Sequence, residues 1–184
     1  MILRVDSLIK GSALHGPGLR YVIVTQGCHT NCPGCNAQQT FDPKGGRSLD
    51  TNDIVKEIYE GDGEMYNGIT FTGGEPFLQA DALSEIAGYI IRANSTKINR
   101  ETFKPKDIIC YTGYTYEEIQ KLIGNGANSY MKLLCSIDYL IDGKYDKDKA
   151  FEGSKAVSTS NQRIIDVKET LRQRQVVEID KLTW

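Results

Sequence analysis

Short apolar runs and amphipathic segments alternate along most of the chain. The apolar runs are a few residues long and rich in β-branched side chains, a pattern typical of buried strands. Between them, apolar residues recur at the spacing of one helical face, which predicts helices. We expect strands within residues 1–10, at an edge of the sheet, and at 19–25, 68–72, 107–112 and 137–141, with extended pieces at 163–167 and 175–179. The expected helices start at Asp50 or Thr51 and cover 80–92, 116–123 and residues near 168–173.

This alternation of strands with helices predicts βα units and a mostly parallel sheet. The chain has 184 residues, fewer than a complete eight-stranded barrel usually needs. We therefore expect an α/β fold, a shortened and open (β/α) partial barrel, formed by residues 1–184 as a single domain. The polar stretches 36–47 and 94–106 are expected to be irregular.

Composition and charge narrow the class of protein. The chain is 40% hydrophobic and 25% charged, with a formal net charge of −2, which is typical of a soluble globular protein. This balance does not predict a nucleic-acid partner. The apolar runs are too short to span a membrane, and the N-terminal residues lack the pattern of a signal peptide. We therefore expect a cytoplasmic protein without a membrane partner, whose cysteines stay reduced.

The five cysteines form two groups. Cys110 and Cys135 lie inside apolar runs and are expected to be small buried hydrophobes. Cys28, Cys32 and Cys35 instead share one short loop directly after an expected strand. An odd number of cysteines in a reducing compartment argues against a disulfide framework. Three soft thiolates on one loop make a metal or iron–sulfur site the first hypothesis.

Glycine-containing turns follow the next expected strands. The cysteine loop, Gly73-Gly74, Thr112-Gly113 and Asp142-Gly143 each lie at or just past the carboxyl end of such a strand. That edge binds ligands in βα folds. Paired glycines can let backbone groups approach a ligand, although glycine can also serve only to turn the chain, and Glu75-Pro76 can simply begin a helix. Their position on the same rim as three cysteines favours a functional turn.

The number of cysteines separates a cluster from a zinc site. Three cysteines leave one iron of a four-iron cluster without a protein ligand, and such an iron can bind a substrate or cofactor. A structural zinc needs four ligands. His29 is the local candidate for the fourth, but its neighbour Cys28 is already an expected ligand. The cluster is therefore the favoured interpretation.

Taken together, the motifs resemble the radical S-adenosylmethionine superfamily, and within it the family of anaerobic ribonucleoside-triphosphate reductase activating proteins. The cysteine loop has the spacing Cys-x3-Cys-x2-Cys, and six segments carry the resemblance in the expected order. They are Gly16-Pro17-Gly18-Leu19-Arg20, Gly27 with the cysteine loop and its Pro33-Gly34, Phe71-Thr72-Gly73-Gly74-Glu75-Pro76, Tyr111-Thr112-Gly113-Tyr114, Leu140-Ile141-Asp142-Gly143-Lys144-Tyr145 and Ser160-Asn161-Gln162-Arg163-Ile164-Ile165-Asp166-Val167.

The resemblance implies a radical SAM fold and a radical-generating activase, which is an enzyme. A [4Fe-4S] cluster held by Cys28, Cys32 and Cys35 would bind S-adenosyl-L-methionine (SAM) through its open iron. The reduced cluster would cleave SAM to methionine and a 5′-deoxyadenosyl radical. That radical would take a hydrogen atom from one glycine of anaerobic ribonucleoside-triphosphate reductase, the protein substrate. The electron would come from an external low-potential donor of the flavodoxin or dithiol type.

The resemblance also implies residue roles. The cofactor-binding residues would be Gly34 and Asn36 at the adenosyl moiety, Gly73, Gly74 and Glu75 at the methionine end, and Thr112 and Asp142 on the same rim. Arg20, Lys144 and Arg163 would meet a carboxylate or the partner protein, or would be solvated surface charges.

The chain departs from the family pattern in four places without losing a cysteine. Gly34 stands where many superfamily members have an aromatic residue, as it does in the activating-protein subgroup, and Asn36 stands where an aromatic residue or histidine is common. His15 replaces a more usual asparagine, and residues 152–159 lengthen a connection. Three alternatives stay open: an activase of another glycyl-radical enzyme, another small radical SAM enzyme, and a zinc-stabilised binding module without catalysis.

Overall fold

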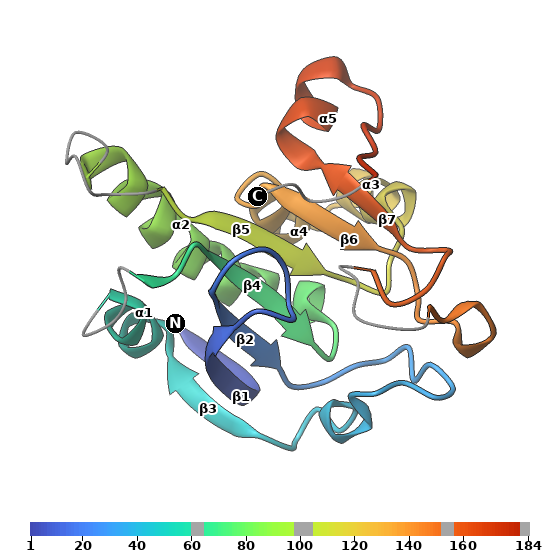
Figure 1. Ribbon diagram of the computed structural model, residues 1–184, viewed down its shortest axis with the longest axis horizontal. Helices are drawn as coiled ribbons and strands as arrows, with labels where there is room; N and C mark the ends of the chain where they lie inside the picture. Colours follow the sequence, from blue (N-terminus) through green and yellow to red (C-terminus); the bar gives the residue numbers. More distant parts are fainter. Residues whose placement is uncertain (60–64, 98–104, 152–156, 181–184) are drawn as a thin grey trace.

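The computed structural model of the protein describes residues 1–59, 65–97, 105–151 and 157–180 (Figure 1). A seven-stranded sheet organises these residues, in the order β3-β1-β2-β4-β5-β6-β7. The strands are β1 (Ile2–Ser12), β2 (Arg20–Thr25), β3 (Arg47–Asp50), β4 (Gly68–Gly73), β5 (Asp107–Tyr111), β6 (Tyr139–Asp142) and β7 (Arg163–Asp166). The α-helices are α1 (Thr51–Tyr59), α2 (Ala80–Lys97), α3 (Tyr116–Gly124), α4 (Asn128–Leu134) and α5 (Val167–Gln173). Short 3-10 turns are η1 (Gln38–Thr40), η3 (Pro76–Gln79) and η4 (Lys147–Lys149).

The sheet has a parallel centre and antiparallel margins. Strands β2, β4, β5 and β6 run parallel to their neighbours in that order. Strand β1 is antiparallel to both β2 and β3, and β7 is antiparallel to β6. The expected α/β fold with an open sheet is therefore confirmed, and the parallel arrangement holds for the four central strands, while the sheet as a whole is mixed.

Three expectations about the elements were wrong. Strand β1 is not at the edge, because the short strand β3, which begins at the end of the expected irregular stretch 36–47, pairs with it. Three of the four β3 side chains are polar, and none is fully buried, so no apolar pattern marks it. Helix α2 continues to Lys97 into the expected loop 94–106. Helix α4, which follows the predicted α3, was not expected at all.

The two remaining cysteines have different surroundings. Cys110 on β5 is fully buried, as expected. Cys135 is exposed, which contradicts the expectation. It is the C-cap of α4, one residue after the buried pair Leu133 and Leu134. The buried part of the apolar run therefore ends at Leu134, which is also the last residue of α4.

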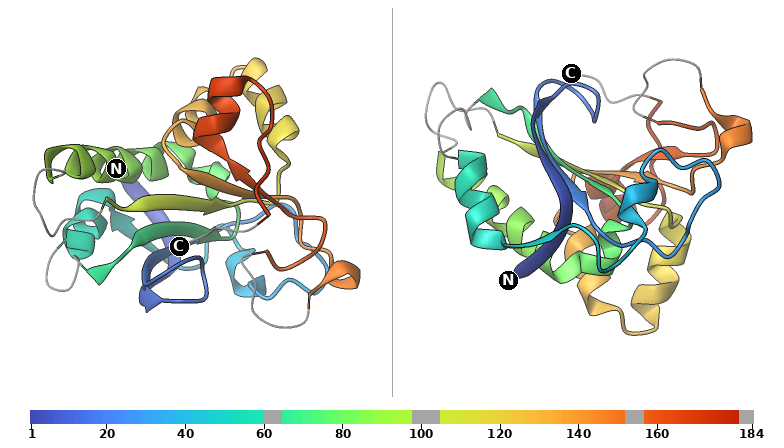
Figure 2. Two further views of the ribbon diagram at one scale, coloured as in Figure 1. Left: turned by 45° about the horizontal axis from the view of Figure 1, so that its top comes forward. Right: turned by 90° about the horizontal axis from the view of Figure 1, so that it is seen from below.

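The side chains of β5 point alternately to the two faces of the sheet and pack into two different hydrophobic clusters. Ile108 and Cys110 belong to the large core cluster that includes residues of α1, α2 and α4, and helices α1 to α4 lie along one face of the sheet (Figure 2). Ile109 belongs to a smaller cluster with Ile141, against which Tyr111 packs. Successive side chains of a strand point to opposite faces. The second face is therefore the one that carries Tyr111 towards the site described below.

The amino ends of the central strands enclose a buried arginine. Arg20, fully buried at the start of β2, donates from Nε to the Thr70 hydroxyl at 2.7 Å and from Nη1 to Asp107 Oδ1 at 2.8 Å. It also donates to the Ile69 carbonyl at 2.8 Å and to the Pro17 carbonyl at 3.3 Å, which fastens the loop before β2. Arg20 thus meets a carboxylate, and the surface-charge interpretation was wrong for it.

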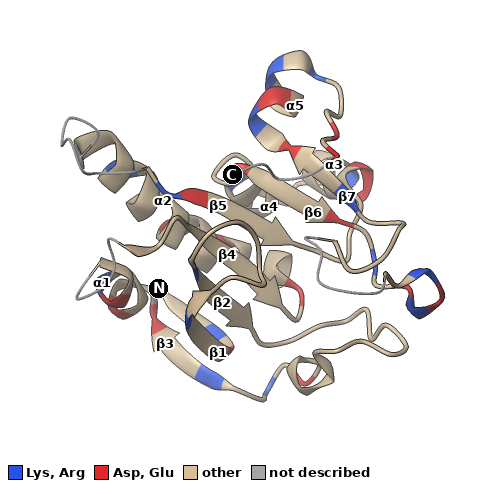
Figure 3. Cartoon of the chain, viewed as in Figure 1, with Lys and Arg blue, Asp and Glu red and all other residues tan. Residues whose placement is uncertain are grey.

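The remaining charged residues lie mainly on helices, strand ends and turns (Figure 3). Arg163 also meets carboxylates, those of Asp142, Glu117 and Glu178. Within residues 1–59, 65–97, 105–151 and 157–180, no helix has the length and apolar character needed to cross a membrane. Of the lengthened connection 152–159, residues 152–156 lie outside the described residues, and Thr159 forms a bridge with Ala150.

Candidate functional site

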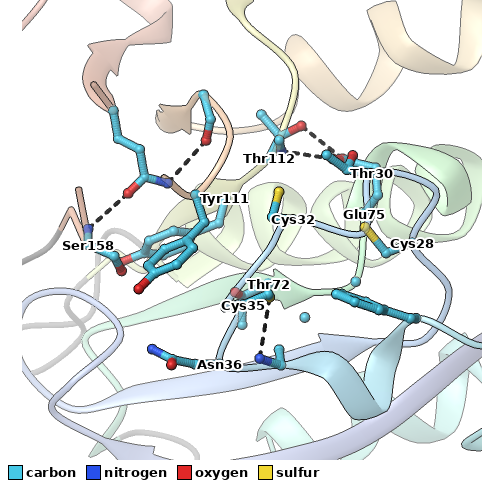
Figure 4. Close-up of a pocket in the computed structure, with 18 of the residues that line it drawn as sticks. Cys28, Thr30, Cys32, Cys35, Asn36, Thr72, Glu75, Tyr111, Thr112 and Ser158 are labelled. Atoms are coloured by element: carbon cyan, nitrogen blue, oxygen red, sulfur yellow. Dashed lines mark hydrogen bonds between the residues drawn. The ribbon is translucent and has the colours of Figure 1, made fainter. Parts of the chain in front are cut away.

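A pocket of about 320 Å³ opens at the carboxyl edge of the parallel strands (Figure 4). Four strand ends and the loop before β2 contribute to its lining. The residues are Leu14 and His15 from that loop; Cys28, Thr30, Cys32, Cys35, Asn36, Ala37 and Phe41 after β2; Thr72, Gly73, Gly74 and Glu75 at β4; Tyr111, Thr112 and Gly113 at β5; and Gly143, Tyr145, Ser158 and Gln162 beyond β6. The expected convergence of strand ends on one rim is therefore confirmed.

The cysteine loop brings all three clustered cysteines to this pocket. The Gly27 N–H donates to the Thr40 carbonyl at 2.7 Å and the Cys28 N–H to the Phe41 carbonyl at 3.2 Å, so the start of the loop is anchored to the segment around η1. Each of the three thiols is partly exposed. A loop whose thiols line an open pocket is accessible to a group bound there.

The three thiols line one pocket without gathering around a single metal position. Among the described residues, no group of three or more His, Cys, Asp or Glu side chains is arranged to hold one metal ion. A four-iron cluster does not require that convergence, because each cysteine binds a different iron. His29 is exposed, and its ring packs on Tyr114 with 5.3 Å between the centroids. It does not line the pocket, whereas all three clustered cysteines do.

A backbone N–H points at one of the three sulfurs: the Ala37 N–H donates to Cys35 Sγ at 3.4 Å. Such a donor favours a thiolate over a thiol, as a ligand sulfur requires. At Cys32, burial raises the pKa of the thiol, whereas the Tyr145 backbone and the charge of Lys144 act to lower that pKa.

The Gly73-Gly74 turn packs directly on the cysteine loop. The Gly74 N–H donates to the Thr25 carbonyl at 2.9 Å and the Glu75 N–H to the Gly27 carbonyl at 2.8 Å. A Cβ on Gly74 would lie 2.2 Å from the Gly27 oxygen, and Gly73 has a φ of +110°. Glycine is thus required because the Gly73-Gly74 turn and the start of the cysteine loop approach each other closely. The glycines also leave backbone without side chains at the pocket wall.

Glu75 is a buried carboxylate in that wall, with only 1% of its surface exposed. Its Oε1 accepts the Phe77 N–H at 3.1 Å and the Thr112 hydroxyl at 2.8 Å, and its Oε2 accepts the Gly113 N–H at 2.8 Å. Burial raises its pKa to about 7, although the three hydrogen bonds oppose this. Glu75 is also the N-cap of η3, with Pro76 in its first turn, so the helix-start interpretation is correct as well.

Two of the residues that the resemblance implied lie outside the pocket lining. Asp142 is 1% exposed, and its carboxylate accepts from Arg163 Nε at 3.0 Å and from the Tyr116 N–H at 2.8 Å. Gly34 lies in the loop itself, where an added Cβ would contact Lys147 and Tyr145. The structure places the other implied residues, Asn36, Gly73, Gly74, Glu75 and Thr112, in the lining.

The sequence analysis missed several lining residues. Tyr111 and Tyr145 form part of the wall, and burial raises the pKa of Tyr111 to about 12. Strand alternation next to Thr112 could have placed Tyr111. Leu14 and His15 come from a loop whose position depends on the buried Arg20, so no local pattern could have placed them.

The family described as a 4Fe-4S single cluster domain matches residues 14–165. The chain belongs to this family. The matched residues run from the loop before β2 to β7 and include the cysteine loop and the turns of the pocket. The predicted iron–sulfur chemistry is thereby confirmed at the level of the family.

Curated relatives agree with this assignment. The chain is 30% identical to the anaerobic ribonucleoside-triphosphate reductase-activating protein of Enterobacteria phage T4 over 169 residues, 88% of this chain and 93% of that protein. It is 28% identical to the protein of the same name from Vibrio cholerae, over 82% of this chain and 90% of that protein. It is 33% identical to pyruvate formate-lyase 1-activating enzyme of Escherichia coli K12, but over only 44% of this chain and 34% of that enzyme. The resemblance predicted from the motifs is confirmed.

Proposed function

We propose that this protein is a radical SAM activase that generates a glycyl radical on an anaerobic ribonucleoside-triphosphate reductase. The observation that carries the proposal is the meeting of three cysteines and the Gly73-Gly74-Glu75 turn in one pocket. The likeness to the phage T4 activating protein, which covers 93% of that relative, supports the choice of substrate.

In this proposal Cys28, Cys32 and Cys35 hold a [4Fe-4S] cluster with one open iron. When bound, the cluster supplies the electron for reductive cleavage of SAM to methionine and a 5′-deoxyadenosyl radical. The protein orients the bound groups and excludes water. The Ala37 N–H favours the thiolate form of Cys35, and the loop anchors at Thr40 and Phe41 hold the sulfurs in place.

The remaining residues of the pocket would position SAM. We assign the backbone of Gly73, Gly74 and Glu75 to the methionine end, because that turn is bare and adjoins the cysteine loop. Asn36 and Thr112 line the pocket and are assigned to the cofactor. Asp142 instead anchors Arg163, and Gly34 shapes the cysteine loop through its left-handed backbone, with a φ of +75°.

We further propose that the mixed, open sheet is the partial barrel of the radical SAM type. Its open side would admit the glycine-bearing segment of the protein substrate. The electron would come from an external low-potential donor.

Anaerobic reconstitution of the full chain with iron and sulfide tests the proposal. We expect four irons per chain, a visible absorption that dithionite bleaches, and 5′-deoxyadenosine release when SAM is added. Co-incubation with an anaerobic ribonucleoside-triphosphate reductase should then give a glycyl-radical signal in electron paramagnetic resonance. Stoichiometric zinc without SAM cleavage would instead indicate the non-catalytic zinc module.

The nearest alternative is an activase of another glycyl-radical enzyme. The similarity to pyruvate formate-lyase 1-activating enzyme favours shared chemistry, but it covers only 34% of that enzyme. Parallel incubation with the reductase and with pyruvate formate-lyase distinguishes the two. A glycyl radical in the lyase alone would replace the proposed substrate while leaving the SAM chemistry intact.

A further inference from the structure

The turn after β6 lies against the cysteine loop. A Cβ on Gly34 would lie 3.4 Å from Lys147 Cβ and 3.8 Å from Tyr145 Cε1, so residues 145–147 pack on the loop from behind. Tyr145 also lines the pocket together with the three cysteines. We call residues 143–146 the β6 turn.

Side-chain amides of the segment before β7 hold the β6 turn in this position. Asn161 Nδ2 donates to the Lys144 carbonyl at 2.8 Å, and Gln162 Nε2 donates to the Gly143 carbonyl at 3.1 Å. Gln162 Oε1 in turn accepts the Ser158 N–H at 2.9 Å, the bond drawn at Ser158 in Figure 4. The Gly143 N–H donates to the Tyr114 carbonyl at 2.9 Å. The turn is therefore fixed from both sides.

Lys144 lies between Gly143 and Tyr145, which both line the pocket. Its side-chain stem passes over Gly113, where an added Cβ would lie 3.9 Å from Lys144 Cγ. Gly113 is also a pocket residue, and its N–H donates to Glu75. Lys144 is exposed and forms no salt bridge with a described carboxylate, whereas Lys149 pairs with Asp146 at 3.2 Å.

Charges and N–H groups near an iron–sulfur cluster change its reduction potential. Reduction adds one electron and makes the cluster more negative. A positive side chain or an N–H directed at a ligand sulfur therefore stabilises the reduced form more than the oxidised form, which raises the potential. The stem of Lys144 lies over Gly113, a residue of the pocket that the three cysteines line.

We propose that Lys144 raises the reduction potential of the cluster, and that Asn161 and Gln162 are positioning residues that hold the β6 turn against the cysteine loop. This inference rests on the proposed function, because it requires a cluster on the three cysteines. The donor is oxidised by one electron and the cluster is reduced by that electron. Lys144 makes this transfer easier for a weak reductant.

The test is the midpoint potential of the reconstituted full chain, measured without SAM by electron paramagnetic resonance at set ambient potentials. Lys144→Gln removes the charge, Lys144→Arg keeps it, and Lys144→Glu reverses it. Lys121→Gln on α3 is the matched control, because it makes the same charge change on an exposed residue outside the pocket lining.

At the wild-type midpoint, the ratio of reduced to oxidised cluster should fall about three- to tenfold in Lys144→Gln, where tenfold corresponds to about 59 mV for one electron. It should fall further in Lys144→Glu, and stay within about twofold of wild type in Lys144→Arg and Lys121→Gln. The difference between wild type and Lys144→Gln should shrink as salt is added, because an exposed charge is screened.

Equal potentials in Lys144→Gln and Lys121→Gln, with four irons retained in each, would overturn this inference alone. A salt-independent difference would overturn its charge-based explanation. Failure of the wild-type chain to take up a cluster would overturn the proposed function as well, and iron analysis distinguishes that result from the other two.

Discussion

The two ends of the central strands bury opposite charges in different ways. At the amino ends, fully buried Arg20 meets the carboxylate of Asp107 and further acceptors, so the charge is neutralised. At the carboxyl ends, Glu75 is equally buried but faces three hydrogen-bond donors and no cationic side chain among the described residues. Pairing with an opposite charge offsets desolvation more fully than neutral donors do.

This difference matches what each end of the sheet does. The amino end is closed, since Arg20 ties β2, β4, β5 and the loop at Pro17 together. The carboxyl end is open, with a pocket lined by thiols and bare glycine backbone. One end of the strands stabilises the fold, and the other keeps reactive groups accessible.

The largest expected effect is the loss of iron binding and SAM cleavage when a cysteine of the pocket is replaced. Cys32→Ala should reduce iron content after reconstitution and abolish 5′-deoxyadenosine formation, because a proposed ligand is removed. The urea-unfolding midpoint of the cluster-free protein should change little, since Cys32 is only partly buried. Cys135→Ala, which changes an exposed cysteine outside the pocket, is the control and should keep full iron content. Normal activity in Cys32→Ala would refute the ligand assignment.

The second effect concerns stability at the closed end. Arg20→Met should lower the free energy of unfolding by about 3–5 kcal/mol, because it leaves Asp107 and buried carbonyls without their donor. Urea unfolding of the cluster-free protein measures this change. Arg172→Met, which breaks an exposed pair with Glu169, should leave the unfolding midpoint unchanged. A small change in the free energy of unfolding for Arg20→Met would contradict the stabilising role assigned to the amino ends of the strands.

The third effect is a pH dependence at Glu75. Its pKa is raised from 4.5 to about 7, which corresponds to about 3 kcal/mol. The folded state favours the protonated carboxyl, so this contribution to stability is complete below pH 4.5 and is lost as the pH rises through 7. Glu75→Gln stays neutral.

The free energy of unfolding of wild type should therefore fall relative to that of Glu75→Gln between about pH 4.5 and 7. Urea unfolding of the cluster-free proteins at several pH values measures this difference. A constant difference would mean that the hydrogen bonds from Phe77, Thr112 and Gly113 outweigh burial and keep the carboxylate ionised.

The smallest expected effect is on stability, at the contact between the Gly73-Gly74 turn and Gly27 at the start of the cysteine loop. Gly74→Ala should destabilise the protein by about 1–3 kcal/mol, because the new Cβ would lie 2.2 Å from the Gly27 oxygen. Gly124→Ala is the matched control, since an added Cβ there meets nothing within 4 Å. That variant should be neutral or slightly more stable. Thermal unfolding of both variants provides the comparison, and equal midpoints would contradict it.

The parts of the fold that could be predicted are those with a local signal. The four central strands and helices α1, α2 and α3 have apolar periodicity or caps, and the structure contains them close to the expected residues. Strand β3 has three polar side chains out of four and no fully buried one, and it pairs with β1 through backbone hydrogen bonds. Such pairing is a non-local property, and no pattern within residues 47–50 indicates it.

The features of the site likewise divide into those with a local sequence signal and those without one. The cysteine spacing and the Gly73-Gly74 turn are local motifs that point to a cluster and to a ligand-binding edge. The surroundings of Asp142, which Arg163 and the Tyr116 N–H occupy, depend on residues distant in sequence. The same holds for Lys144, whose carbonyl accepts from Asn161 Nδ2 in the segment before β7.

The sequence by itself determined the kind of chemistry, because thiol ligands and their spacing are covalent facts of the chain. It also determined which strands carry the pocket, because the carboxyl ends of parallel strands share one edge. Only the tertiary structure decided which charges are paired, which are buried and which face the pocket. Those properties depend on desolvation and on contacts between segments far apart in the chain, as Arg20 and Glu75 demonstrate at the two ends of the same sheet.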